Sequence, residues 1–151
     1  RDAGAFEELR RQAIAPLVRV CQSLNSMLQE RLNPGRGQPE RPHGALPLRL
    51  GDRVIDAWID AEAYALYTLG DVTGIVEGRS PGARSSFNKV FWSELDIRLH
   101  RAALDLLGPE AELDGPWMKG YEFALSGPIY AGTNEIQRNI IAERVLGLPR
   151  K

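Results

Sequence analysis

Cysteine is nearly absent from this chain of 151 residues, in which Cys21 stands alone. A single cysteine excludes a disulfide within the chain, which is typical of a reducing compartment, and we therefore predict a cytoplasmic protein. We interpret the thiol as a small buried core residue. A reactive thiol would need a nearby base, and the two histidines, His43 and His100, lie far from it in the sequence.

Long apolar runs and an excess of one charge are also missing. No run approaches the roughly 20 apolar residues of a membrane-spanning helix, and residues 1–13 lack the apolar core of a signal peptide. Lys and Arg number 19 and Asp and Glu number 20, so the net charge is −1. This balance gives no reason to expect nucleic acid or an anionic membrane as a partner. The charged start suggests a fragment of a longer protein.

Several motifs of known chemistry are lacking as well. The sequence contains no zinc-ligand spacing, no P-loop and no dinucleotide-binding glycine pattern, so we predict no metal site. Neither histidine lies near a serine or cysteine in an arrangement that predicts nucleophilic catalysis. The remaining composition, 43% hydrophobic and 26% charged residues, is that of an ordinary globular protein.

Apolar residues recur at steps of three and four, which predicts helices and no strand. The predicted helices cover about 6–32, 52–77, 83–107 and 117–126, and a last one begins at 134. Pro16 kinks or divides the first helix. Asp52 is a plausible N-cap of the second, and Gly78 ends it. Thr133 is the predicted N-cap of the last helix, with Glu135 in its first turn.

Two of these helices have apolar faces for which we predict burial. In 52–77, one stripe contains Val54 and Ala61, and a second stripe beside it contains Ile55, Ile59 and Leu66. A face that wide predicts burial on more than one side. In the last helix, the predicted apolar face consists of Ile136, Ile140 and Val145.

The helices are joined by turns, apart from one long connection. The stretch 33–47 holds four prolines and three glycines, and we predict a flexible Pro/Gly loop over 33–49. Long helices joined by turns favour an antiparallel four-helix bundle. The sequence therefore predicts an all-α protein in which residues 1–151 form a single helical-bundle domain.

The segment Tyr130-Ala131-Gly132-Thr133 is the place where the residues themselves point to a ligand. Gly132 allows a close approach of the backbone, and the N–H groups at the start of the following helix attract a carboxylate, a phosphate or a polarised carbonyl. The alternative is a capped helix that simply follows a turn.

The run "IYAGTNEIQRNIIAERVLG" at 129–147 resembles the closing signature of the flavin-dependent acyl-CoA dehydrogenases. Weaker likenesses are "SSFNK" around Lys89 and "AALDLLGP" at 102–109. The resemblance implies that the chain is the C-terminal four-helix bundle of a three-domain protein that binds FAD. It also implies an acyl-CoA substrate, which loses an α-proton to a carboxylate and a β-hydride to the flavin.

The resemblance also assigns site residues by position. Thr133, Asn134 and Glu135 fall where the family contacts FAD. Tyr130, Ala131 and Gly132 fall where it contacts the acyl-CoA. Asp105 and Gly108 fall where the helix approaches the FAD of a neighbouring subunit. Asp105 and Pro109 depart from the family pattern there, which weakens this second contact.

Ala131 stands where many relatives carry the glutamate that acts as the base, and a methyl group cannot accept a proton. In one account the base lies at the start of the bundle's first helix, upstream of Arg1, with Glu7 and Glu8 as weaker candidates. In the other account the subunit has lost its base, as in actinobacterial relatives that pair a competent subunit with an incompetent one.

Three functions follow from these accounts. The chain is the C-terminal domain of an acyl-CoA dehydrogenase, a non-catalytic scaffold subunit that completes a partner's FAD site, or a free-standing helical interaction module. The resemblance implies a homo-oligomer (dimer or tetramer) or a heteromer with a related subunit, and electron transfer to an electron-transfer flavoprotein.

Overall fold

The structure is a computed structural model that describes residues 8, 19–20, 22–24, 26–27 and 48–150. Every regular element in the described part of the chain is a helix, so the prediction of an all-α fold is confirmed. The elements are the α-helices α2 (Leu48–Val76), α3 (Ser85–Leu107), α4 (Pro116–Ala124) and α5 (Asn134–Arg144), and the short 3-10 helices η1 (Gly82–Arg84) and η2 (Gly108–Glu112).

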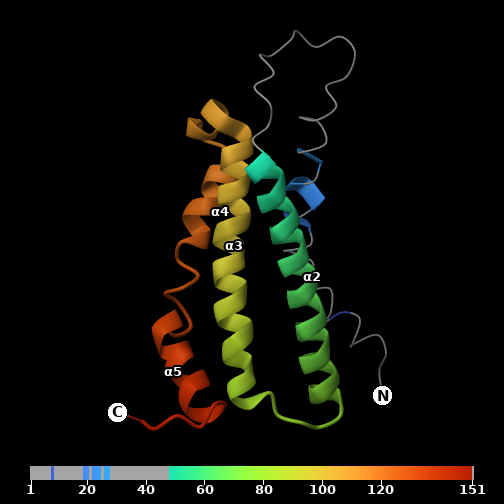
Figure 1. Cartoon of the computed structure of the whole chain (residues 1–151), viewed down its shortest axis with the longest axis vertical. Coiled ribbons are helices and arrows are strands. Elements are labelled where there is room, and N and C mark those ends of the chain that lie inside the picture. Colours follow the sequence, from blue (N-terminus) through green and yellow to red (C-terminus); the bar gives the residue numbers. More distant parts are fainter. Residues whose placement is uncertain (1–7, 9–18, 21, 25, 28–47, 151) are drawn as a thin grey trace.

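Helix α3 is the centre of this arrangement. It runs antiparallel to α2 on one side, while α4 and α5 follow each other along its other side (Figure 1). The predicted first helix over 6–32 falls largely outside the described residues, as does the kink or division predicted at Pro16. The described residues between 6 and 32 are helical. One of them, Leu24, is buried in the core.

The core lies between α2, α3 and the helical residues described between 19 and 27. Leu95 and Leu99 of α3 are fully buried. The buried cluster consists of Leu24, Val54, Ala57, Ala61, Leu95, Leu99, Ala103 and Leu106. The alanines on α2 and α3 let these two helices approach closely, because small side chains at the contact shorten the interaxial distance.

The helix ends agree with the predictions except at one cap. Thr133 caps α5 as predicted, because its hydroxyl accepts a hydrogen bond from the backbone N–H of Ile136. Gly78, with φ 84°, follows the end of α2. The N–H groups of Gly78 and Arg79 bond to Ile75 O and Gly74 O, which forms a Schellman motif.

The prediction that Asp52 caps α2 is wrong, because α2 begins one turn earlier, at Leu48. Leu48 and Arg49, which the predicted loop over 33–49 includes, therefore belong to this helix. The rest of that loop lies outside the described residues.

Two predicted apolar faces are also wrong. Ile55, Ile59 and Leu66 are 56%, 59% and 69% exposed, because α2 is covered along only one stripe. In the face predicted for the last helix, Ile136 of α5 is 53% exposed, and Val145, directly after α5, is 42% exposed. The buried residue of α5 is the polar Asn134, at 3% exposure. Helix α5 is therefore attached to α3 by hydrogen bonds as well as by apolar contact.

Candidate functional site

The segment between α4 and α5 folds into a hydrogen-bonded turn that presents residues 130–132 to solvent. The N–H groups of Ile129 and Tyr130 both donate to Ser126 O, and the N–H of Asn134 donates to Pro128 O. Ala131 and Gly132 adopt left-handed backbone conformations with φ of 55° and 86°. Tyr130, Ala131 and Gly132 are all exposed, so a ligand can reach them.

The helix N-terminus differs from the prediction in one respect that matters for binding. Its N–H groups are engaged within the chain: those of Asn134, Ile136 and Gln137 donate to Pro128 O, the Thr133 hydroxyl and Thr133 O. Within this turn, the backbone N–H groups of Ala131, Gly132 and Thr133, just before the helix, have no hydrogen-bond partner among the described residues. The available donors therefore belong to the turn.

Glu135 adds an exposed negative charge beside this turn. Hydrogen bonds from its own backbone N–H and then from the Thr133 hydroxyl lower the pKa of the Glu135 carboxyl, with smaller contributions from Arg138 and Lys89. The carboxylate is thus satisfied at the helix N-terminus, where the helix dipole favours an anion. A group held ionised in this way is a poor proton acceptor near neutral pH.

Asn134 fixes the start of α5 against α3. Its Oδ1 accepts from Lys89 Nζ at 2.7 Å and from Ser93 Oγ at 3.2 Å, and its Nδ2 donates to Ser93 Oγ and to Glu94 Oε1. Glu94 also forms an ion pair with Arg138 of α5. Because the Asn134 amide is buried and satisfied inside the chain, its side chain does not face a ligand.

The cation in this network is partly shielded from water. Desolvation lowers the pKa of the Lys89 ammonium, and the nearby carboxylates of Glu135 and Glu94 oppose that change. The sequence singles out Lys89 and Asn134 only through the family resemblance. Ser93 and Glu94 were missed, although Ser93 lies one helical turn after Lys89 and therefore on the same face.

Tyr130 belongs to a small aromatic cluster at the other side of the turn. Its ring centroid lies 5.9 Å from that of Trp92 on α3 and 6.5 Å from that of Phe123 on α4. Burial, and then the charge of Asp96, raise the pKa of the Tyr130 hydroxyl, so the group is a neutral phenol at neutral pH. The cluster offers an apolar wall beside the exposed backbone donors.

Asp105 and Gly108 lie well away from the turn. Asp105 is eleven residues beyond Glu94 on α3, about 16 Å along the helix at about 1.5 Å per residue. Its carboxylate forms an ion pair with Arg53 of α2. Gly108 ends α3 with φ 62° and is exposed. The structure therefore brings residues 130–135 together and separates them from Asp105 and Gly108.

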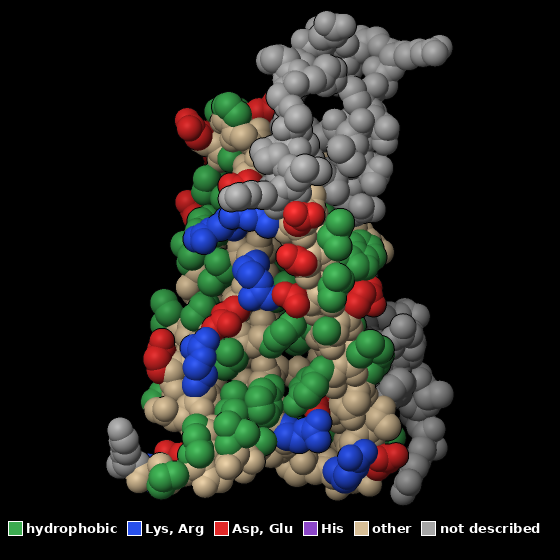
Figure 2. Space-filling model, viewed as in Figure 1, with side chains coloured by type: hydrophobic (Ala, Val, Ile, Leu, Met, Phe, Trp, Pro, Cys, Tyr) green, Lys and Arg blue, Asp and Glu red, His purple; other side chains and the backbone are tan. Residues whose placement is uncertain are grey.

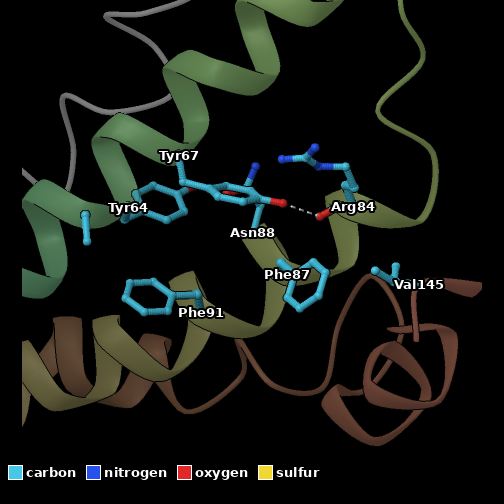
Figure 3. A pocket seen from close by; sticks show the side chains of 8 residues that line it. Tyr64, Tyr67, Arg84, Phe87, Asn88, Phe91 and Val145 are labelled. Carbon is cyan, nitrogen blue, oxygen red and sulfur yellow. Dashed lines mark hydrogen bonds between the residues drawn. The ribbon is translucent and has the colours of Figure 1, made fainter. Parts of the chain in front are cut away.

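Sequence reasoning also missed an aromatic groove between α2 and α3. The groove has a volume of about 450 Å³, and Figure 3 shows the rings of Tyr64, Tyr67, Phe87 and Phe91 along it. Its lining residues are Ala63, Tyr64, Tyr67, Arg84, Phe87, Asn88, Phe91 and Val145. In Figure 2, hydrophobic side chains gather in the lower half of the molecule as it is viewed. None of the predicted site residues lines the groove.

Metal-binding clusters and membrane-spanning helices are both missing from the part of the chain that the structure describes. No group of three or more His, Cys, Asp or Glu side chains there could hold a metal ion. Among the same residues, no helix combines the length and the apolar character that crossing a membrane requires.

The family follows from this fold, this turn and the match of the sequence to a family model. Residues 34–146, more than half of the chain, match the model of the acyl-CoA dehydrogenase C-terminal domain. The chain therefore belongs to the acyl-CoA dehydrogenase family, a family of flavoprotein oxidoreductases, and corresponds to its C-terminal helical domain.

Among characterised relatives, the chain is 40% identical over 107 residues to the acyl-CoA dehydrogenase IpdE1 of Mycobacterium tuberculosis. This match covers 66% of the chain and 27% of the relative. The chain is 30% identical to the acyl-CoA dehydrogenase FadE26 of the same organism over 123 residues, which cover 66% of the chain and 30% of the relative. The chain thus spans about a quarter to a third of the length of these relatives.

Solved structures agree on the fold. The ChsE4–ChsE5 complex from Mycobacterium tuberculosis aligns with a TM-score of 0.72 and 25% identity, over 91% of this chain and 36% of that one. An FAD complex of PigA aligns with a TM-score of 0.67 and 22% identity, over 97% of this chain and 39% of that one. At the latter identity the likeness concerns the fold alone.

Proposed function

We propose that residues 1–151 form a single helical domain of a longer three-domain acyl-CoA dehydrogenase. The full protein removes hydrogen from the α- and β-carbons of an acyl-CoA thioester, is cytoplasmic and passes its electrons to an electron-transfer flavoprotein. The domain contributes the turn at 130–135 to the site where thioester and FAD meet. The family match and the exposed turn support this proposal.

The single observation that carries the proposal is the set of backbone donors at Ala131, Gly132 and Thr133. These N–H groups have no partner among the described residues, and the first two belong to exposed residues. Donors of this kind stabilise the negative charge that develops on a thioester carbonyl when the α-proton leaves. These donors belong to the backbone, so they are present with alanine at position 131 as they would be with glutamate.

Ala131 itself takes no part in the proton transfer. Its side chain is a methyl group at the position where many relatives carry the glutamate base. The base comes from elsewhere in the full protein, or from a partner subunit. Of the two candidates at the start of this chain, Glu8 is exposed, and Glu7 lies outside the described residues.

Thr133 and Glu135 would hold FAD at the exposed edge of the turn, beside the free backbone donors of Ala131 and Gly132. The chemistry that FAD supplies when bound is acceptance of the β-hydride. Asn134 supports this edge from behind, because its amide is used by Lys89, Ser93 and Glu94. At the other end of α3, Gly108 is exposed and Asp105 is paired with Arg53. These two residues would contact the FAD of a neighbouring subunit, and the ion pair with Arg53 weakens the contribution of Asp105.

The test is purification of the full-length protein that contains this chain. It is expected to purify yellow, with the absorption of oxidised flavin, and to reduce an electron-accepting dye when an acyl-CoA is added. A colourless full-length protein that stays inactive with each of a panel of acyl-CoA thioesters, alone and with a co-expressed related subunit, would contradict the proposal.

A second candidate function is a non-catalytic scaffold subunit in a heteromer. Ala131 favours it, together with Asp105 and Pro109, which depart from the family pattern. The solved ChsE4–ChsE5 complex is a related assembly of two different subunits, whereas the first candidate is also compatible with a homo-oligomer. Co-expression with the related subunit separates the two: in the scaffold, removing the partner's own glutamate base abolishes all activity.

A further inference from the structure

We propose that Gln137 is a positioning residue that holds the peptide between Ala131 and Gly132, so that the turn keeps its exposed backbone N–H groups available to the acyl thioester. The inference rests on the proposed function for the identity of that ligand. The geometry behind it involves one side chain of α5 that reaches back over the turn.

The backbone at Ala131 and Gly132 needs outside support. Both residues have positive φ, 55° and 86°. Glycine adopts such a conformation readily, whereas the Cβ of alanine meets the neighbouring carbonyl oxygen there. Two left-handed residues in a row are uncommon in a turn that contains an alanine. An interaction that exists only in this conformation is therefore needed to keep it populated.

Gln137 supplies this interaction. Its Nε2 donates a hydrogen bond of 2.9 Å to the Ala131 carbonyl oxygen, six residues earlier in the chain. The same Nε2 lies against Gly132: a Cβ placed on that glycine would be 2.7 Å from it. The amide of Gln137 therefore occupies the space that a side chain at 132 would need. The backbone angle favours glycine at 132, and a side chain there would have to displace the Gln137 amide from this contact.

The hydrogen bond also determines where the Gly132 N–H points. A trans peptide is planar, so the N–H of residue 132 points opposite to the carbonyl of residue 131. With that carbonyl directed at Gln137, the N–H is directed away from α5, where it has no partner among the described residues. If the peptide rotated, the N–H would turn inward and the turn would lose one of its exposed donors.

Selective labelling of the chain of residues 1–151 gives a direct test, because this chain contains the pair Ala-Gly only at 3–4 and 131–132. With ¹³C in the alanine carbonyl and ¹⁵N in glycine, carbon–nitrogen coupling selects only the amides of Gly4 and Gly132. The Ala131 carbonyl shift reports the hydrogen bond, and the Gly132 amide shift reports the orientation of the peptide. The signals of the pair Ala3-Gly4 serve as an internal reference in the same spectrum.

Gln137→Met keeps the length of the side chain and removes the donor. We expect the Ala131 carbonyl signal to move upfield and the Gly132 amide signal to shift or broaden. The matched control is Asn139→Met, which changes an exposed amide of the same helix that has no side-chain hydrogen bond among the described residues. The control should leave both signals in place.

Gln137→Glu distinguishes positioning from general structural support. At neutral pH its carboxylate cannot donate, so the spectrum should resemble that of Gln137→Met. As the pH falls through the ordinary carboxyl pKa of about 4.3, the protonated group can donate again, and the two signals should return toward those of the wild type at the same pH.

The proposal is overturned if Gln137→Met leaves both signals unchanged, if Asn139→Met moves them equally, or if acid produces no recovery in Gln137→Glu. A failure of the proposed function is a separate result, namely a full-length protein without flavin reduction. It would leave these spectra as they are, so the two failures can be told apart.

Discussion

Lys89 Nζ lies 2.7 Å from Asn134 Oδ1, which joins the middle helix α3 to the first residue of α5. Asn134 is 3% exposed and also bonds to Ser93 and Glu94. The start of α5, and with it the turn at 130–133, is therefore held by a buried polar contact. Since apolar contact alone does not fix the rotation of a helix, these hydrogen bonds determine how the turn faces solvent.

Asn134→Ala should destabilise the domain, because it leaves buried polar groups of α3 without their partner. The cost of such unsatisfied groups is roughly 1–3 kcal/mol. The measurement is the free energy of unfolding in urea. Asn139→Ala, an exposed change on the same helix, is the matched control and should stay within about 0.5 kcal/mol of the wild type. Equal effects of the two substitutions would contradict the role given to Asn134.

Gly132→Ala should be destabilising for two separable reasons. The positive φ of 86° disfavours alanine, and the new Cβ would lie 2.7 Å from Gln137 Nε2. Shortening Gln137 to alanine removes only the second cause. In a double-mutant cycle, the two substitutions should therefore cost less together than the sum of the single costs, by at least about 0.5 kcal/mol. Strict additivity would show that the two residues do not compete for this space.

His100 predicts a dependence of stability on pH. Burial lowers the pKa of the His100 imidazole, but the side-chain hydrogen bond, the backbone hydrogen bond and the charge of Asp96 together outweigh burial and raise it. Nδ1 lies 3.2 Å from Asp96 Oδ1 and 2.9 Å from Asp96 O. A raised pKa means that the folded state binds the proton more tightly than the unfolded state.

The stabilisation from this proton is therefore complete below the unfolded pKa of about 6.5, and it is lost as the pH rises through the higher folded pKa. The free energy of unfolding should fall over this window in the wild type. The measurement is a series of urea unfolding curves from pH 5.5 to pH 8.5, with His100→Gln as the reference, because glutamine does not titrate. An identical slope in both proteins would rule out this contribution of His100.

The sequence predicted most of the fold because periodicity reports directly on helices. The bounds of α3, the start of α5, the cap at Thr133 and the Schellman glycine Gly78 follow from local rules that depend on neighbouring residues only. The burial of a face does not. Ile55 and Ile59 have the pattern of a packed stripe and are exposed, because burial depends on which elements meet in space.

The candidate site was predictable in position but not in detail. The segment at 130–133 is marked by glycine and a helix start, and the family resemblance gives it a ligand. The spacing of residues could not predict that the helix N–H groups are already hydrogen-bonded, or that the Gln137 side chain bonds to Ala131 O. Both contacts depend on the path of a turn with two left-handed residues. Similarly, the aromatic groove arises only where α2 and α3 come together.

The decisive measurement is stopped-flow bleaching of the oxidised flavin by an acyl-CoA in the full-length protein, with Ala131→Gly and Ala131→Trp compared with the wild type. If the turn lies against the thioester while its side chain at 131 is chemically inert, Ala131→Gly should keep a rate close to that of the wild type. Ala131→Trp should displace the thioester and slow the reaction by about a hundredfold or more. An unaltered rate in Ala131→Trp, or a complete loss of bleaching in Ala131→Gly, would contradict this account.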